Sequence, residues 1–203
     1  MNPDMPNIDF YFDFISPYSY LAASQISQFE QQHKADFNWL PINLPRLIKL
    51  SGNMPPGQIR NKALYSLRDL KRWAGYLDVP FKMIKPGTFD SRPALRIAGA
   101  LETDERGRFC RSIFNALWSG QVDPTKANWL ALAIETESLP KAWLDLQSEE
   151  FESNTHAALK AGAFGAPSFI LQTHGRPELF FGLDHMDFLA RACDPVTSQN
   201  ISK

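Results

Sequence analysis

Strand-forming segments occur near the two ends of this chain, and the long stretch between them has the pattern of helices. Residues 8–14 and 37–42 are rich in β-branched and aromatic residues, and a helix is predicted between them over 19–32. Strand patterns return at 168–171 and 178–181, before a last helix over 184–193. A βαβ unit makes its two strands parallel, and the final pair is close enough for a hairpin, so one small mixed sheet is predicted.

Helices separated by Pro and Gly interrupt that sheet. They are predicted over 61–77, 91–103, 107–119, 126–137, 141–147 and 150–162. The sequence therefore predicts an α/β, thioredoxin-like fold with an inserted all-helical subdomain over 44–162. The split thioredoxin-like domain would comprise 8–43 and 163–193, and residues 1–7 and 194–203 would be mobile tails.

Composition and charge exclude several classes of function. The net charge is −1, with Lys and Arg scattered among acids, so no nucleic-acid binding is expected. Cys110 and Cys193 form no Cys-x-x-Cys pair, and the histidines lack ligand spacing, so no metal site is predicted. No signal peptide and no stretch approaching ~20 apolar residues occurs, so no membrane partner and a cytoplasmic location are expected.

Ser16 lies in the segment Asp13-Phe14-Ile15-Ser16-Pro17, where the first strand meets the first helix. Free backbone N–H groups and the positive end of the helix dipole favour an anion there, and a thiolate is one. A Ser hydroxyl can donate a hydrogen bond to a bound thiolate but cannot form a disulfide, which argues against a dithiol oxidant. Taken alone, Ser16-Pro17 is more often only a helix cap.

Two further motifs lie at strand ends. Ala166-Pro167 precedes the third strand, where a cis turn would leave the backbone of Ala166 free to pair with an extended peptide. Residues 181–184 begin the last helix, whose N–H groups could hold a carboxylate while Asp184 holds an ammonium group. Each motif alone also fits a simple turn or cap. Together they supply the parts of a glutathione site, because thioredoxin topology would gather them at one edge of the sheet.

On these motifs the sequence resembles the 2-hydroxychromene-2-carboxylate isomerase family and its relatives, the kappa-class glutathione transferases, of the DsbA-like group. The matching segments are 12–22, 51–56, 69–73, 162–167 and 181–184. The resemblance implies a glutathione-dependent isomerase that interconverts cis and trans forms of an aromatic oxo acid by transient thiol addition, in aromatic compound catabolism. A kappa-like glutathione transferase and a non-catalytic glutathione- or peptide-binding module are the alternatives. Members of the family are often dimers, so a homodimer is left open.

The same resemblance implies roles for individual residues. Ser16 would activate the glutathione thiol, and the backbone of Ala166 would bind its cysteinyl part, with Pro167 cis. The γ-glutamyl end would be held by Phe181, Gly182, Leu183 and Asp184, the last through its side chain. The second substrate, a small aromatic molecule, would be bordered by Asn53, Phe89, Asp90 and Arg92.

Three positions depart from the family pattern. Leu183 stands where relatives often have a small polar residue, and His185 replaces the usual Arg. Asp90 occupies a place often held by Asn, where it would repel an anionic substrate unless Arg92 or Arg96 pairs with it. These departures leave the substrate and the choice between isomerase and transferase open.

Overall fold

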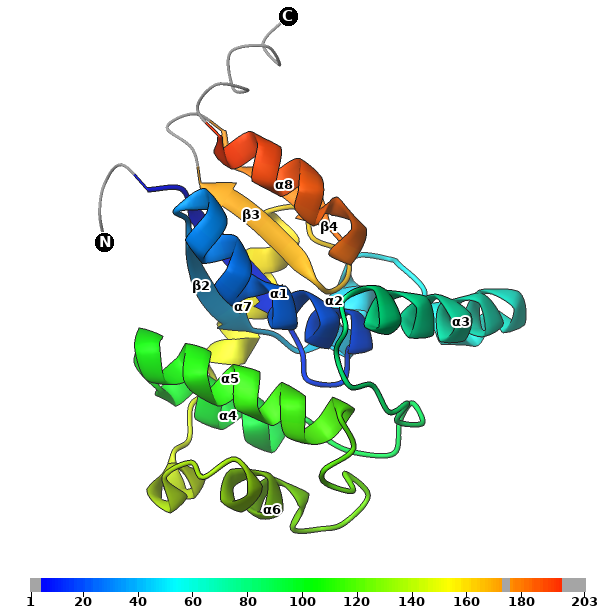
Figure 1. The fold of residues 1–203 in the computed structure, drawn as a ribbon, viewed down its shortest axis with the longest axis vertical. Coiled ribbons are helices and arrows are strands. Elements are labelled where there is room, and N and C mark those ends of the chain that lie inside the picture. Colours follow the sequence, from blue (N-terminus) through cyan, green and yellow to red (C-terminus); the bar gives the residue numbers. More distant parts are fainter. Residues whose placement is uncertain (1–4, 173–175, 195–203) are drawn as a thin grey trace, which may run out of the picture.

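A four-stranded mixed sheet forms the centre of the computed structural model, which describes residues 5–172 and 176–194 (Figure 1). The strands are β1 (Asn7–Phe12), β2 (Asp36–Pro41), β3 (Ser168–Gln172) and β4 (Glu178–Phe181), in the order β2-β1-β3-β4. β1 runs parallel to β2, whereas β3 is antiparallel to both β1 and β4. The predicted parallel pair and the predicted hairpin are both confirmed.

Alternating side chains of the strands build two cores, one on each face of the sheet. Phe10 and Phe12 of β1 are completely buried on one face, where α1 (Pro17–His33) and α8 (Met186–Cys193) cover them together with α5 (Thr103–Trp118). In Figure 1 α1 and α8 lie side by side in front of the sheet. Tyr11 of β1 and Ile170 of β3 point into a smaller core on the other face, because successive residues of a strand face opposite ways.

The second face is covered by α2 (Leu44–Leu50) and α7 (Glu150–Lys160). Thr155 of α7 accepts a hydrogen bond from the backbone N–H of Asn43 at 2.9 Å, which ties the two helices together. Both helices lie within the predicted insertion 44–162, yet they pack on the sheet. The division into domains stays a prediction, and these contacts favour a shorter insertion than 44–162. Residues 1–4 and 195–203 of the predicted tails lie outside the described residues.

The predicted insertion also contains α3 (Arg60–Tyr76), α4 (Arg92–Ala100), α5 (Thr103–Trp118) and α6 (Trp129–Thr136). Among the described residues, the 3-10 helices η1 (Pro56–Gln58) and η2 (Lys141–Asp145) lie in the same part of the chain, and η3 (Leu183–His185) directly precedes α8. The segment predicted as a helix over 141–147 is therefore a 3-10 turn, and the last α-helix begins at Met186 after η3. In Figure 1 α4, α5 and α6 stack below the sheet, and α3 extends to one side.

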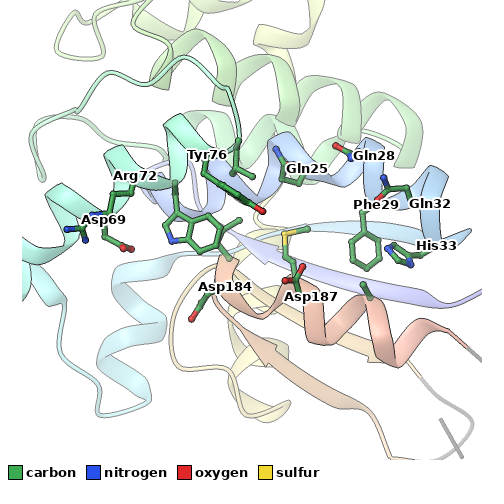
Figure 2. A pocket seen from close by; sticks show the side chains of 15 residues that line it. Gln25, Gln28, Phe29, Gln32, His33, Asp69, Arg72, Tyr76, Asp184 and Asp187 are labelled. Atoms are coloured by element: carbon green, nitrogen blue, oxygen red, sulfur yellow. The ribbon is translucent and has the colours of Figure 1, made fainter. Parts of the chain in front are cut away.

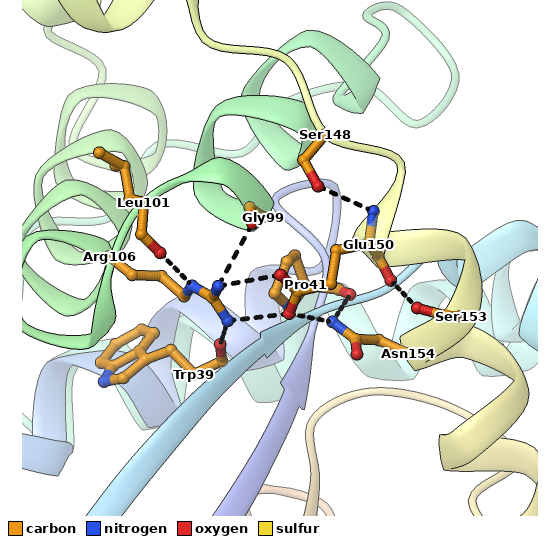
Figure 3. Close-up of polar contacts among 9 residues, drawn as sticks. All are labelled: Trp39, Pro41, Gly99, Leu101, Arg106, Ser148, Glu150, Ser153 and Asn154. Carbon is orange, nitrogen blue, oxygen red and sulfur yellow. Dashed lines mark hydrogen bonds and ion pairs between the residues drawn. The ribbon is translucent and has the colours of Figure 1, made fainter.

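One arginine joins this inserted part to the sheet (Figure 3). Arg106 of α5 donates two hydrogen bonds to the carboxylate of Glu150 in α7, both at 3.0 Å. Its other three N–H groups reach the carbonyl oxygens of Trp39, Gly99 and Leu101 at 3.0–3.3 Å. The five donors of the guanidinium are thus all used, and the Arg106 side chain is only 13 % exposed. We call these residues the Arg106 cluster.

Candidate active site

Ser16 joins two segments that lie 150 residues apart. Its Oγ accepts a hydrogen bond from the backbone N–H of Ser19 at 3.1 Å, which makes it the N-cap of α1. The same hydroxyl donates to the carbonyl oxygen of Ala166 at 3.3 Å. No acidic residue occupies the first turn of α1, and the positive end of this 17-residue helix faces the site. Ser16 is therefore both a helix cap and a link to the second predicted motif.

The Ala166–Pro167 peptide bond is cis, as the family resemblance implies. Ala166 is half-buried, and its N–H has no hydrogen-bond partner among the described residues. The carbonyl oxygen of Pro167 accepts from the N–H of Gly182 at 3.0 Å, which connects this turn to the third motif. Gly165 lies directly against Phe181, since a Cβ at this glycine would stand 2.9 Å from the phenyl ring.

Asn53 is held against the same turn. Its side-chain amide donates to the carbonyl oxygen of Phe164 at 3.0 Å, and its own oxygen accepts from the N–H of Met54 at 2.8 Å. The ring of Phe164 in turn packs on that of Phe181, with 4.3 Å between centroids. The structure thus places Asn53 beside the turn that carries Ala166, in addition to any contact with a second substrate.

Leu183 and Asp184 follow Gly182, whose φ of 97° is a conformation that favours glycine. The side chain of Leu183 is buried, whereas that of Asp184 is 65 % exposed and lies 3.4 Å from Nδ1 of His185. Both residues line a groove of about 590 Å³ between α1, α3 and the start of α8 (Figure 2). Ser16 and Ala166 are not among the residues that line this groove.

The groove also contains residues that were not predicted to bind glutathione. Asp69, Arg72 and Trp73 of α3 line it opposite Asp184, and Figure 2 shows Asp69 and Asp184 on its two sides. Asp69 accepts a hydrogen bond at 3.0 Å from the hydroxyl of Tyr18, which is two residues after Ser16 in the sequence. The segment 69–73 carries part of the family resemblance, which was the available signal.

Asp13 is a second residue that sequence reasoning missed. It reads as an interruption of a strand, but its side chain is almost completely buried at the end of β1. Burial raises the pKa of its carboxyl to about 6 from the ordinary 3.8, although hydrogen bonds from Ser91, Leu44 and Ile15 oppose that shift. An acid directly after a buried apolar strand was the signal for it.

Three of the residues predicted to border the second substrate, Phe89, Asp90 and Arg92, contact one another or α6. Phe89 packs edge-on against Trp129, with 5.6 Å between ring centroids. Arg92 forms a bidentate ion pair with Asp90, at 2.7 and 2.9 Å, and this pair lowers the pKa of the Asp90 carboxyl. The pairing that the sequence required of Asp90 is therefore present, and within the described residues none of these side chains contacts Ser16.

Comparison with known proteins identifies the relatives of this chain. The DSBA-like thioredoxin domain family matches residues 7–194. The 2-hydroxychromene-2-carboxylate isomerase of Pseudomonas sp. (strain C18) is 30 % identical over 196 residues, which cover 91 % of this chain and 89 % of that protein. This chain belongs to the 2-hydroxychromene-2-carboxylate isomerase family of DsbA-like thioredoxin proteins.

Two further relatives agree with this family. A solved structure of a 2-hydroxychromene-2-carboxylate isomerase superposes with a TM-score of 0.77 at 27 % identity, covering 96 % of this chain and 97 % of that one. Glutathione S-transferase kappa 1 of Homo sapiens is 25 % identical, covering 94 % of this chain and 92 % of that protein. The predicted family and the thioredoxin-like fold of DsbA type are confirmed. The roles predicted for individual residues of this isomerase family member stay predictions.

The lack of a stretch approaching ~20 apolar residues predicted no membrane partner, and the structure gives the length and apolar character of the helices. None of those within residues 5–172 and 176–194 would be able to cross a membrane.

Proposed function

We propose that this protein is a glutathione-dependent isomerase that interconverts cis and trans forms of an aromatic oxo acid of the 2-hydroxychromene-2-carboxylate type. One observation carries the proposal. Ser16 at the N-terminus of α1 reaches Ala166, and Gly182 at the start of η3 is bonded to Pro167, so three separate motifs form one bonded unit. Family membership supports the same conclusion.

The groups in this unit fit the parts of glutathione. Ala166 offers an unpartnered N–H to an extended peptide, and Ser16 offers a hydroxyl beside a helix N-terminus to a sulfur. The exposed carboxylate of Asp184 suits an ammonium group, and it lies in the groove that opens from the start of α8. Leu183 adds no polar side chain, so we expect backbone N–H groups to bind the γ-glutamyl carboxylate.

Glutathione, when bound, supplies the thiol nucleophile that adds to a conjugated carbon of the substrate and leaves after the bond has rotated. The chain's own residues keep that thiol ionised and in place. The Ser16 hydroxyl turns from the carbonyl oxygen of Ala166 toward the sulfur, while the N–H of Ser19 holds its oxygen. The positive end of α1 favours the anionic form of the sulfur, and Asn53 keeps the Ala166 turn in position.

The test mixes protein, glutathione and the chromene acid and follows the absorbance of the open benzylidenepyruvate. We expect equilibration that requires glutathione, and a loss of about a hundredfold or more in kcat/KM for Ser16→Ala, because a donor to the reacting anion is removed. Ser24→Ala is the matched control, since Ser24 is an exposed serine of the same helix. Equal rates in the two variants would contradict the proposal.

A kappa-like glutathione transferase is the second candidate, and the segment 89–92 favours it. Arg92 is engaged by Asp90, and the nearby Arg96 by Glu149, so neither arginine is free to bind a substrate carboxylate. An uncharged electrophile would fit such a segment better than an anionic one. Stoichiometric loss of glutathione with a halodinitrobenzene, without isomerisation, would support the transferase, and glutathione binding without turnover would leave a binding module.

We propose further that the enzyme is a homodimer. Large exposed apolar side chains are concentrated on α3 and the segment before it: Leu50, Met54, Ile59, Leu64, Tyr65, Leu67 and Tyr76. Such patches are typical of protein–protein contacts. Sedimentation should give a dimer for the wild type and for Leu132→Glu, an exposed leucine of α6, and a monomer for Leu64→Glu. A wild-type monomer would contradict this part of the proposal.

We place this activity in the cytoplasm, in the breakdown of aromatic compounds. Cys110 and Cys193 are both buried and unpaired, and burial raises the pKa of the Cys193 thiol to about 12. Inert thiols of this kind are compatible with a reducing compartment, where glutathione is kept in its thiol form. Fractionation of the producing cells would test this location.

A further inference from the structure

The carboxylate of Asp13 accepts hydrogen bonds from three different segments of the chain. Its Oδ1 accepts from the backbone N–H of Ile15 at 3.2 Å and from the hydroxyl of Ser91 at 2.6 Å. Its Oδ2 accepts from the backbone N–H of Leu44 at 2.9 Å. We call these four residues the Asp13 cluster. Ser91 is 78 positions from Asp13 in the sequence, and Leu44 is 31, so the cluster exists only in the folded chain.

Within residues 5–172 and 176–194, no ion pair or hydrogen bond from a cation reaches this buried acid. The neighbouring charge that acts on it is that of Asp90, which is negative, and Arg92 is already paired with Asp90. The three groups that bind the carboxylate are neutral donors from the β1–α1 turn and from the starts of α2 and α4. A buried carboxylate without a cationic partner costs free energy, and a neutral side chain of similar size would avoid that cost.

Each donor belongs to a segment that carries predicted site residues. Ile15 directly precedes Ser16, and the N–H of Ser16 donates to the backbone carbonyl of Asp13 at 3.0 Å. Leu44 begins α2, which leads at its other end to Asn53. Ser91 precedes α4 within the segment 89–92. The Asp13 cluster therefore connects the Ser16 turn with the start of α2 and with the segment 89–92, which the hydrogen bonds of Ser16 itself do not do.

We propose that Asp13 is a positioning residue, whose carboxylate holds the Ser16 turn, the start of α2 and the start of α4 in the arrangement that the glutathione-dependent reaction needs. This inference rests on the proposed function. A carboxylate suits the task because both of its oxygens only accept, so it can bind three donors at once. An amide of the same shape has one accepting oxygen and would leave at least one of the three donors without a partner.

The experiment compares the wild type with Asp13→Asn and with the control Asp145→Asn, an exposed acid at the end of η2. Amide hydrogen exchange should accelerate by about tenfold in residues 13–19, 43–50 and 89–95 of Asp13→Asn, because hydrogen bonds to a charged acceptor are lost there. The affinity for glutathione and kcat/KM should each fall by about tenfold. The control should match the wild type in all three measurements.

Ser91→Ala is a second variant, which removes one of the three donors and leaves the charge in place. It should accelerate exchange in 89–95 and in 13–19, with a smaller loss of kcat/KM than Asp13→Asn. A uniform acceleration along the whole chain in both variants would mean that Asp13 only stabilises the fold, and the proposal would be overturned. Unchanged kcat/KM in a folded Asp13→Asn protein would overturn it as well.

A failure of the proposed function gives a different result. If the wild type neither binds glutathione nor turns over the chromene acid, the binding and kinetic assays fail for every variant alike. The exchange measurement needs no ligand and still decides whether Asp13 holds the three segments together.

Discussion

The Arg106 cluster and the Asp13 cluster both join the inserted helices to the sheet, but they do so with opposite electrostatics. Arg106 meets the carboxylate of Glu150 in a bidentate pair, and its remaining donors all reach carbonyl oxygens. Asp13 is buried with neutral donors only, and the charge nearest to act on it has its own sign. One cluster is matched in charge and the other is not.

The two clusters therefore have different roles: the Arg106 cluster anchors the inserted helices, and the Asp13 cluster belongs to the candidate site. A pair of opposite charges with all donors of the guanidinium used fixes the arrangement of α4, α5, α7 and β2. A lone buried carboxylate lowers stability at neutral pH, and groups of that kind are characteristic of functional sites, where activity and not stability is optimised. The predictions below test that distinction.

The largest effect is expected from Arg106→Ala. The substitution leaves the Glu150 carboxylate and three carbonyl oxygens without their donor, and breaking this partly buried pair costs about 3 kcal/mol of unfolding free energy. Arg46→Ala is the control, because Arg46 pairs with Glu152 on the surface with its side chain 45 % exposed, and should cost about 1 kcal/mol or less. Urea denaturation measures both. Equal losses would show that the Arg106 cluster is not an anchor.

The second prediction concerns the pH dependence of the Asp13 cluster. The pKa of the Asp13 carboxyl is about 6 in the folded protein and about 3.8 in the unfolded chain. The folded protein therefore keeps the carboxyl protonated to a higher pH than the unfolded chain does. The contribution of Asp13 to the unfolding free energy is then greatest below about pH 4. It falls by about 3 kcal/mol in all as the pH rises toward about 6.

Urea titrations of the wild type and Asp13→Asn at several pH values isolate this contribution. The unfolding free energy of the wild type minus that of the variant should decrease from about pH 4 to about pH 7 and stay constant above. Other carboxyl groups cancel in the difference. A difference that increases with pH would mean that the charge of Asp13 is stabilised in the fold, and the contrast with Arg106 would disappear.

The third prediction concerns Gly182, in a part of the site that neither cluster touches. With a φ of 97°, Gly182→Ala should cost about 1–2 kcal/mol, and its Cβ would stand 2.5 Å from Oδ1 of Asp184. Gly75→Ala in α3, where a Cβ meets nothing within 4 Å, should instead stabilise by about 0.5–1 kcal/mol. Thermal unfolding gives both signs. Stabilisation by Gly182→Ala would show that the turn before η3 is free to relax.

The elements that could be predicted are those with a local signal. Such signals mark the ends of strands and helices: the aromatic run of residues 8–14, Pro17 at the start of α1 and the Pro167 turn. The topology of the sheet then brings those ends together. The seven-residue α2 was not separately predicted, because it is too short to show a helical period. For α7, the sequence shows that one face is apolar but not whether that face packs on the sheet or on other helices.

The contacts that join the inserted helices to the sheet could not be predicted residue by residue. The sequence places Asp13 at a strand end but gives no reason to join it to Ser91, since their hydrogen bond depends on how the inserted helices fold back. Asp90 was predicted to repel an anionic substrate unless an arginine pairs with it. Arg92 could be named as that partner because it lies only two residues away. The groove between α1, α3 and α8 needs three separate elements, so of its lining only Leu183 and Asp184 were named for the glutathione site.

The smallest effect on stability is expected from Asn53→Ala, at the far end of the helix whose start Asp13 holds. Asn53 is exposed, so loss of its bond to the carbonyl of Phe164 should change the unfolding free energy by about 0.5 kcal/mol or less. Calorimetric titration should nevertheless show glutathione binding weakened by about threefold, because the Ala166 turn loses a support. Asn61→Ala, an exposed asparagine of α3, is the control. If glutathione affinity is unchanged while KM for the aromatic substrate rises, Asn53 borders the second substrate only. In that case the Asp13 cluster does not support glutathione binding through α2.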